Sequence, residues 1–184
     1  IGLNLTVPHK VLAMDMVDAL DESAKTWGAV NTVRFEARDK HGQWRPLNHF
    51  PDSIPGEIRS QGFNTDADAV VRSLREDLGL ARRGARVLLV GVGGAGGVAA
   101  LRLASEHVAE LFLVDVVQSK AATVAAEIRR RYPRIRIELG YPRGEMDLAI
   151  NATPLGLSPD DPLPVEGRQF TLRQARTVFD MIYR

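Results

Sequence analysis

A glycine-rich turn between two apolar runs constrains the fold of this chain more than any other feature. The continuous apolar run 87–90 leads directly into Gly91, Gly93 and Gly96, which have the spacing G-x-G-x-x-G, and a helix-like run follows from Val98. In this spacing the first glycine permits a tight turn, the second lets a pyrophosphate approach the backbone, and the third allows close helix packing. The pattern predicts a dinucleotide-binding turn whose helix amides hold the anion. A glycine turn that serves only packing is the alternative.

The residue that follows the next apolar run extends this prediction. Leu111–Val114 ends at Asp115, which is the expected position of the acidic residue in the fingerprint. A carboxylate there accepts hydrogen bonds from a free ribose hydroxyl and repels a 2′-phosphate, so it favours NAD over NADP. Lys120 lies close in sequence and weakens this preference.

The pattern of apolar runs changes at Arg82–Gly84. After this point short apolar strands alternate with helical segments, which is typical of βαβ units and a parallel sheet. The expected strands are 87–90, 111–114, 135–139 and 148–151, with helices to about 107 and over about 119–131. The sequence therefore predicts an α/β protein with two domains, 1–81 and 82–184.

The first of these domains shows a more mixed pattern. Apolar residues at 11, 14, 17 and 20 predict a helix that begins near Pro8, and the stripe from Ala67 to Leu78 predicts a second helix. A strand over 29–35 and turn residues at 39–42 indicate a hairpin. Residues 49–61 have no period and are expected to form a long loop.

Composition excludes several classes of protein. The formal net charge of +1 is too balanced for the basic surface of a nucleic-acid binder, and no apolar stretch approaches the length of a membrane helix. The chain has no cysteine, which fits the reducing cytoplasm, and its 4 histidines show no metal-ligand spacing. We expect no metal, no nucleic acid and no membrane partner. Oligomeric state is not readable from the sequence.

Small polar residues gather at the ends of extended runs in the first domain. They are Asn4, Thr6 and Lys10, then Asn31 and Thr32, then Asn64, Thr65 and Asp66. Such residues suit a small polyhydroxylated ligand, because asparagine supplies both a donor and an acceptor to hydroxyl groups. An amine beside a carboxylate can also move the proton that leaves an alcohol when a hydride leaves its carbon.

These residues give the chain a specific resemblance to the shikimate dehydrogenase family, which includes quinate/shikimate dehydrogenases. The family signature GxNVTxPxK is similar to Gly2–Lys10, with leucine in place of valine. Further motifs follow in family order: Gly28–Thr32, Gly62–Asp66, the glycine-rich turn, Asn151–Leu157 and Val178–Tyr183.

The resemblance implies NAD(P)-dependent interconversion of 3-dehydroshikimate and shikimate in aromatic amino-acid biosynthesis. It implies two domains with the active site in a cleft: a substrate (catalytic) α/β domain and a Rossmann-like, doubly wound NAD(P)-binding domain. By position within the motifs, Lys10 and Asp66 are implied to be catalytic. The implied substrate-binding residues are Thr6, Lys10, Asn31, Asp66 and Tyr183. The implied cofactor-binding residues are Gly91, Val92, Gly93, Gly94, Ala95, Asp115, Asn151, Thr153, Met181 and Glu22.

The chain also departs from the family pattern. An N-terminal strand–helix stretch with a pair of serines and a final helical region with a glutamine have no counterpart, so we expect a fragment whose substrate domain is incomplete at its N-terminus and whose dinucleotide domain is truncated at its C-terminus. Asp115–Ser119 stands in place of the Asn-Arg-Thr clamp of NADP-preferring members, in the direction argued from charge. The loop 39–61 is longer than is typical.

Other readings of these residues stay open. A quinate dehydrogenase shares the motifs, and a module that senses dinucleotides without catalysis would share the fold. Lys10 could be a solvated helix lysine, and Asp66 could cap the helix that follows it. Asn31 and the segment 151–156 could serve only turns, and the basic run 129–131 is expected to be a solvated helix end.

Overall fold

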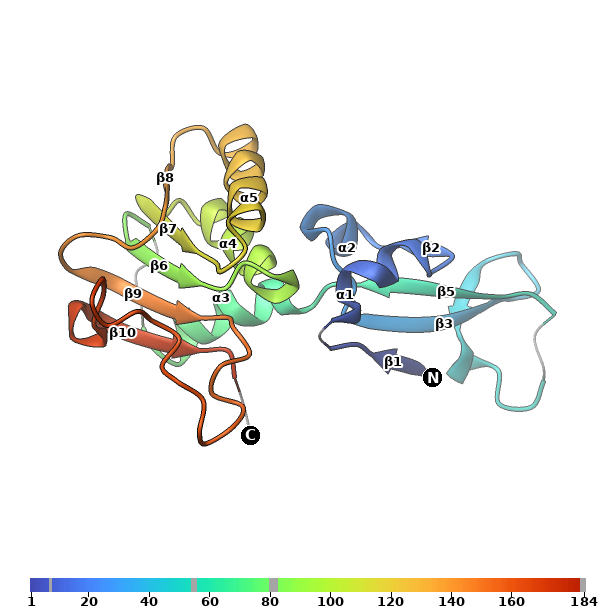
Figure 1. Cartoon of the computed structure of the whole chain (residues 1–184). Coiled ribbons are helices and arrows are strands. Elements are labelled where there is room, and N and C mark those ends of the chain that lie inside the picture. The colour runs from blue at the N-terminus through green and yellow to red at the C-terminus, as the bar shows by residue number, and fades with distance from the viewer. Residues whose placement is uncertain (7, 54–55, 80–82, 183–184) are drawn as a thin grey trace. The chain divides into compact units, whose positions relative to one another are not determined.

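The computed structural model describes residues 1–6, 8–53, 56–79 and 83–182 (Figure 1). Contacts divide the chain into two compact units, Ile1–Ala69 and Val70–Arg184. The first of them ends within the helix 66–76. The domain boundary predicted between residues 81 and 82 lies outside the described residues and stays a prediction.

A mixed sheet forms the centre of the first unit. Its strands follow the order β1-β3-β5-β2, and β4 pairs with the other end of β3. The bounds are β1 Gly2–Asn4, β2 Ala19–Leu20, β3 Thr32–Arg38, β4 Trp44–Pro46 and β5 Ile58–Phe63. Strand β3 runs antiparallel to β1, β4 and β5, whereas β2 and β5 are parallel. This arrangement brings β1 and β5, which are distant in sequence, to the two sides of β3.

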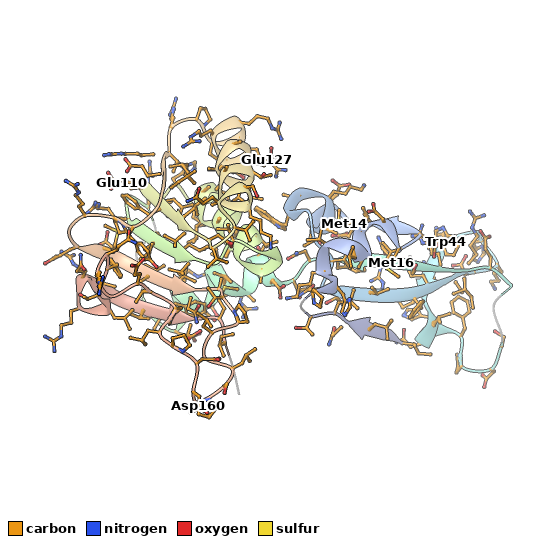
Figure 2. All side chains as sticks on the ribbon, in the orientation of Figure 1. Met14, Met16, Trp44, Glu110, Glu127 and Asp160 are labelled. Atoms are coloured by element: carbon orange, nitrogen blue, oxygen red, sulfur yellow. The ribbon has the colours of Figure 1, made fainter. Side chains whose placement is uncertain are left out.

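The two faces of β3 differ because its side chains alternate. Val33 lies in a buried cluster with Ala13, Ala24 and Val30. On the opposite face, the buried Glu36 carboxylate pairs with the guanidinium groups of Arg34 and Arg59. The Cζ atoms of Arg38 and Arg59 also lie 5.0 and 4.3 Å from the centroid of the Trp44 ring. Trp44 is labelled in Figure 2. The second face is therefore held by charge pairs and cation–π contacts instead of an apolar core.

The predicted hairpin is confirmed. Arg38 pairs with Trp44, and the Asp39 carboxylate accepts hydrogen bonds from the amides of His41 and Gln43. Gly42 has a φ of 77°, a left-handed conformation that glycine adopts without strain. The turn residues thus set the register of β3 and β4.

Two expectations for the first unit were wrong. The helix expected over about 8–20 ends after one turn, α1 (His9–Leu12), and continues as a 3₁₀ turn (Ala13–Asp15) before β2. Val11 is 52% exposed, whereas Met14, Val17 and Leu20 are partly buried against the apolar cluster. Their helical spacing is misleading, because a 3₁₀ turn and a short strand place them on the cluster instead of a helix. The loop expected over 49–61 overlaps the last residue of a 3₁₀ turn (Leu47–His49) at its start and the beginning of β5 at its end.

Two helices complete this part of the chain. Helix α2 (Glu22–Trp27) begins at an Asp21 cap that accepts the Ser23 amide, and it ends at Gly28, which has a φ of 68°. Helix α3 (Asp66–Glu76) follows β5 and buries Ala67, Val70, Val71 and Leu74, as the apolar stripe predicts. The Asn64 side chain accepts the Ala67 amide in its first turn, which leaves the Asp66 carboxylate to other partners.

The second unit is a parallel sheet in the strand order β10-β9-β6-β7-β8. Its strands are β6 Arg86–Val90, β7 Glu110–Val114, β8 Arg136–Leu139, β9 Met146–Asn151 and β10 Ala175–Asp180. Helix α4 (Gly94–Ser105) connects β6 to β7, and helix α5 (Gln118–Arg131) connects β7 to β8. The two helices pack on one another and on the sheet (Figure 1). This alternation confirms the predicted parallel α/β architecture.

Burial explains why these strands read as continuous apolar runs. Helix α4 buries Val98, Ala99 and Leu103, while Leu88, Phe112 and Phe170 form a buried cluster with residues of the sheet. Phe170 precedes a 3₁₀ turn (Leu172–Gln174) that leads into β10. Strand order reverses between β6 and β9, and ligands of such sheets bind at the carboxyl ends of the strands beside this point.

Candidate active site

An ion pair joins two of the predicted residues of the first unit. The Lys10 Nζ atom lies 2.7 Å from Asp66 Oδ2, and the two side chains are 15% and 26% exposed. Lys10 is on the short helix α1 and Asp66 is the first residue of α3. An amine held beside a carboxylate and mostly shielded from solvent can donate or accept a proton.

Asn31 fixes the carboxylate of this pair. Its Nδ2 donates to Asp66 Oδ1 at 2.7 Å, and its Oδ1 accepts the Thr65 amide at 3.0 Å. The Asn31 backbone bonds to Leu5 on one side and to Phe63 on the other, and the Val30 amide donates to the Lys10 carbonyl. The buried Asn31 thus ties together the segments that carry Lys10 and Asp66.

The remaining predicted residues of the first unit are less closely connected. The Thr6 carbonyl accepts the His9 amide, and Thr6 is exposed. Glu22 is exposed and pairs with Lys25 on its own helix. Within the described residues, no hydrogen bond or ion pair joins the Thr6 or Glu22 side chain to Lys10 or Asp66. Tyr183 lies outside the described residues, and the roles of all three stay predictions.

The glycine-rich turn has the geometry that its spacing predicts. Gly91 has a φ of 87°, and a Cβ atom at Gly96 would overlap the Gly91 carbonyl oxygen. Gly93 caps α4 with a φ of −64°, and a Cβ atom there would meet no protein atom within 4 Å. The first and third glycines are therefore required by the fold, whereas the second leaves space beside the first-turn amides of a helix. Such amides have no partner within a helix and can bind an anion.

Asp115 follows β7 and contacts this turn. One carboxylate oxygen accepts the Val92 amide at 2.8 Å and the other accepts the Val117 amide at 2.8 Å. The side chain is thereby fixed at the carboxyl end of β7, next to the turn. Val116 beside it is fully exposed.

The predicted residues at the end of β9 form a network of their own. Asn151 Oδ1 accepts both the amide and the hydroxyl of Thr153, and Asn151 Nδ2 donates to the Leu155 carbonyl and to Asp180. The Met181 amide donates to the Asn151 carbonyl at 2.9 Å. The structure thus brings Asn151, Thr153 and Met181 together.

Sequence reasoning missed two residues of these networks. Thr65 was noted as polar, but its contact with Asn31 was not foreseen. Asp180 lies within the motif Val178–Tyr183 and has no predicted role, although it accepts a hydrogen bond from Asn151 on the neighbouring strand. A short polar residue at the end of a predicted strand beside another is the signal that could have identified it.

The described residues contain neither a cluster of metal-ligating side chains nor a helix that could cross a membrane. Within the described ranges, no group of three or more histidine, aspartate or glutamate side chains is placed to hold a metal ion. No helix in the same ranges has the length and apolar character needed to cross a membrane. The candidate functional groups are the Lys10–Asp66–Asn31 network in the first unit and, in the second unit, the glycine-rich turn and the Asn151 network.

Comparison with known proteins adds an independent line of evidence. A family model described as the shikimate dehydrogenase substrate binding domain matches residues 1–33. The chain is 30% identical over 190 residues to a shikimate dehydrogenase (NADP(+)) of Methanopyrus kandleri, with 100% of the chain and 59% of that protein aligned. The chain therefore spans less than two thirds of the length of this relative.

Solved structures agree with this match. Quinate dehydrogenase from Corynebacterium glutamicum in complex with NAD is 29% identical with a TM-score of 0.69, covering 99% of the chain and 59% of that structure. Shikimate dehydrogenase from Aquifex aeolicus shares the fold at 23% identity and a TM-score of 0.69, covering 100% and 59%. By its motifs, its fold and these relatives, the chain is similar over its whole length to members of the shikimate dehydrogenase family.

Proposed function

We propose that this protein is an NAD(P)-dependent shikimate dehydrogenase that interconverts 3-dehydroshikimate and shikimate. The observation that carries the proposal is the shielded ion pair between Lys10 and Asp66, with Asn31 bonded to the same carboxylate. The pair joins residues of two distant motifs, and its carboxylate is also bonded to a third motif residue, Asn31. The Methanopyrus relative carries this activity in its name.

The ion pair supplies the proton chemistry of the reaction. In the direction of reduction, the Lys10 ammonium donates a proton to the ketone oxygen as a hydride reaches its carbon. In the direction of oxidation, the Lys10 amine takes the hydroxyl proton. Asp66 stabilises the charged amine and holds it in place through the 2.7 Å contact. The Asp66 carboxylate also offers acceptor oxygens to ring hydroxyls, and Asn31, whose amide nitrogen donates to Asp66 and Thr65, keeps that carboxylate in place.

The other predicted roles complete this proposal. Thr6 and Tyr183 join Asn31 in holding substrate hydroxyls, and Glu22 lies near the cofactor. Residues 1–81 form the substrate domain and residues 82–184 form the dinucleotide domain. The reaction belongs to aromatic amino-acid biosynthesis in the cytoplasm.

The glycine-rich turn fits a dinucleotide. Open space at Gly93, beside the first-turn amides of α4, suits a pyrophosphate cradled by residues 91–95, and Asp115 suits the adenosine ribose. The bound nicotinamide ring supplies or accepts the hydride. The Asp115 carboxylate would face a 2′-phosphate with like charge, so we propose that NAD is preferred over NADP.

Quinate dehydrogenase is the second candidate. It is favoured by the likeness to the Corynebacterium quinate dehydrogenase in complex with NAD, because that cofactor agrees with the charge of Asp115. The two candidates share the same proton chemistry and differ in the groups that meet one further ring hydroxyl.

Rate measurements test these candidates. Formation of reduced cofactor is followed with shikimate or quinate as substrate, each with NAD and with NADP. Faster turnover of shikimate supports the first candidate, and faster turnover of quinate supports the second. Dinucleotide binding without turnover of either acid would replace both with a non-catalytic dinucleotide-sensing module.

A further inference from the structure

The ends of β9 and β10 carry a polar pair that the proton chemistry does not use. Asn151 is the last residue of β9 and Asp180 is the last residue of β10, and the two are partners in the parallel register. Asn151 Nδ2 donates to Asp180 Oδ1 at 3.0 Å. The pair therefore links the carboxyl ends of two neighbouring strands.

The Asn151 amide has no hydrogen-bonding capacity left for a ligand. Its oxygen accepts two hydrogen bonds from Thr153, and its nitrogen donates one to the Leu155 carbonyl and one to Asp180. An asparagine side chain offers two donors and two acceptor sites. Asn151 is also only 5% exposed. Its side chain holds the conformation of the segment 152–155 through its hydrogen bonds to Thr153 and Leu155.

Asp180 acts in the same way on the segment that leaves β10. The oxygen that accepts from Asn151 also accepts the Ile182 amide at 2.9 Å. The Met181 amide donates to the Asn151 carbonyl at 2.9 Å. The side chains of Asn151 and Asp180 thus fix the direction of the segments that follow β9 and β10.

These segments border the glycine-rich turn. A Cβ atom at Gly91 would lie 2.8 Å from the Thr153 nitrogen, and the Ala152 amide donates to the Val90 carbonyl. Strand β9 lies on one side of β6, and β7, which ends at Asp115, lies on the other. A dinucleotide with its adenosine ribose at Asp115 and its pyrophosphate at the turn therefore directs its nicotinamide half toward β9.

We infer that Asn151 and Asp180 form a positioning pair for the nicotinamide half of the cofactor, and that Asn151 acts through the backbone it orders instead of touching the ligand. This inference rests on the proposed function, because it assumes that the turn binds a dinucleotide. It names two residues that set the shape of one half of that site.

The test compares two ligands that differ only in the nicotinamide. NADH carries the uncharged dihydronicotinamide ring and ADP-ribose lacks it, so their affinities report on each half separately. Affinities are measured by calorimetry for the parent chain and for Asp180→Ala, which removes the oxygen that accepts from Asn151 and Ile182. We expect Asp180→Ala to weaken NADH binding about tenfold and ADP-ribose binding less than about threefold.

Asp180→Asn is the matched variant, because it keeps one accepting oxygen and loses the charge. We expect it to bind NADH within about threefold of the parent. Asn151→Asp places two carboxylates together and should weaken NADH binding as Asp180→Ala does. The reciprocal double variant Asn151→Asp/Asp180→Asn restores one donor facing one carboxylate and should recover part of that loss. Asn48→Asp, in the first unit, controls for the change in net charge.

Several outcomes would overturn the inference. Equal losses for NADH and ADP-ribose after Asp180→Ala would mean that the pair stabilises the whole unit. Equal losses for Asp180→Ala and Asp180→Asn would mean that charge and not position is what matters. If the parent binds neither ligand nor NADPH, the proposed function fails and the inference fails with it. If the parent binds both ligands and the variants do not discriminate, the inference alone fails.

Discussion

The Lys10 amine and the Asp66 carboxylate lie 2.7 Å apart, although 56 positions separate them in the sequence. Lys10 lies on the single helical turn α1, which follows β1 in the chain, and Asp66 is the first residue of α3, which follows β5. Both segments are joined to Asn31, which lies between them at the start of β3. The topology of the sheet is thus what assembles the pair.

Replacing Lys10 should abolish most turnover without loss of cofactor binding. We expect Lys10→Ala to lower kcat at least about a hundredfold, the scale of a lost acid–base group, with dinucleotide affinity unchanged. Steady-state rates and calorimetry measure the two quantities. Lys40→Ala, an exposed lysine in the hairpin turn, is the control. Parallel losses in turnover and cofactor affinity would identify Lys10 as a structural lysine.

Replacing Asn31 should reduce stability. The variant Asn31→Ala leaves the Thr65 amide and the Asp66 carboxylate without the buried Asn31 side chain that both contact, so we expect a loss of about 1–3 kcal/mol in the free energy of unfolding. Urea denaturation of the variant and of Asn48→Ala measures this loss. A midpoint equal to that of the parent would show that Asn31 contributes no net stability.

The three glycines at positions 93, 96 and 97 should respond differently to alanine. Gly96→Ala places a methyl group on the Gly91 carbonyl and should destabilise the fold by about 3 kcal/mol. Gly93→Ala should leave stability unchanged and weaken dinucleotide binding, because its methyl group enters the space assigned to the pyrophosphate. Gly97→Ala is the control, since its Cβ would make only ordinary contacts at 3.5 Å and beyond. Tight cofactor binding by Gly93→Ala would show that the pyrophosphate does not bind in the space beside Gly93.

Replacing Asp115 should relax cofactor selection. Without the carboxylate, the repulsion of a 2′-phosphate disappears, so we expect Asp115→Ala to raise the ratio of NADP to NAD affinity about tenfold. Because the Val92 amide loses its acceptor as well, affinity for both cofactors should fall. Calorimetry with each cofactor gives the ratio, and an unchanged ratio would exclude Asp115 from cofactor selection.

The Asp21 cap should give α2 a pH-dependent contribution. Hydrogen bonds from the Ser23 hydroxyl and the Ser23 amide lower the pKa of Asp21 below its ordinary value of 3.8. A lowered folded-state pKa means that the stabilisation is complete above the unfolded-state pKa and is lost as the pH falls through the folded-state value. Asp21→Ala should cost about 1 kcal/mol near neutral pH and progressively less below about pH 4. Denaturation of both proteins at several pH values measures the difference, and a difference that grows on acidification would contradict the assignment.

The second unit could be predicted from the sequence because its signals are local. Continuous apolar runs, a glycine turn and helical stripes each report on neighbouring residues, and Val87–Val90 and Leu111–Val114 lie within the observed strands. The first unit was harder. Met14, Val17 and Leu20 have helical spacing but are buried by a turn and a strand, and the start of β5 at Ile58 carries little apolar pattern because its partners on β3 include charged residues.

The networks of the candidate site depend on contacts that a single sequence does not display. The motifs identified Lys10 and Asp66, but only the sheet topology shows that Asn31 bonds the same carboxylate. Asp180 was missed because its partner Asn151 lies on another strand 29 positions away. Long-range pairing of polar groups is set by strand register, which local patterns do not specify.

With the role proposed for Asp115, its contact with the Val92 amide would limit how cofactor preference can change. A substitution that admits a 2′-phosphate also removes an acceptor that holds the glycine-rich turn, so selectivity and loop geometry cannot be altered separately at this position. Redesign toward NADP would need a paired replacement, with one residue to receive the extra phosphate and another to satisfy the released amide. An evolutionary change of preference from NAD to NADP would require the same two substitutions.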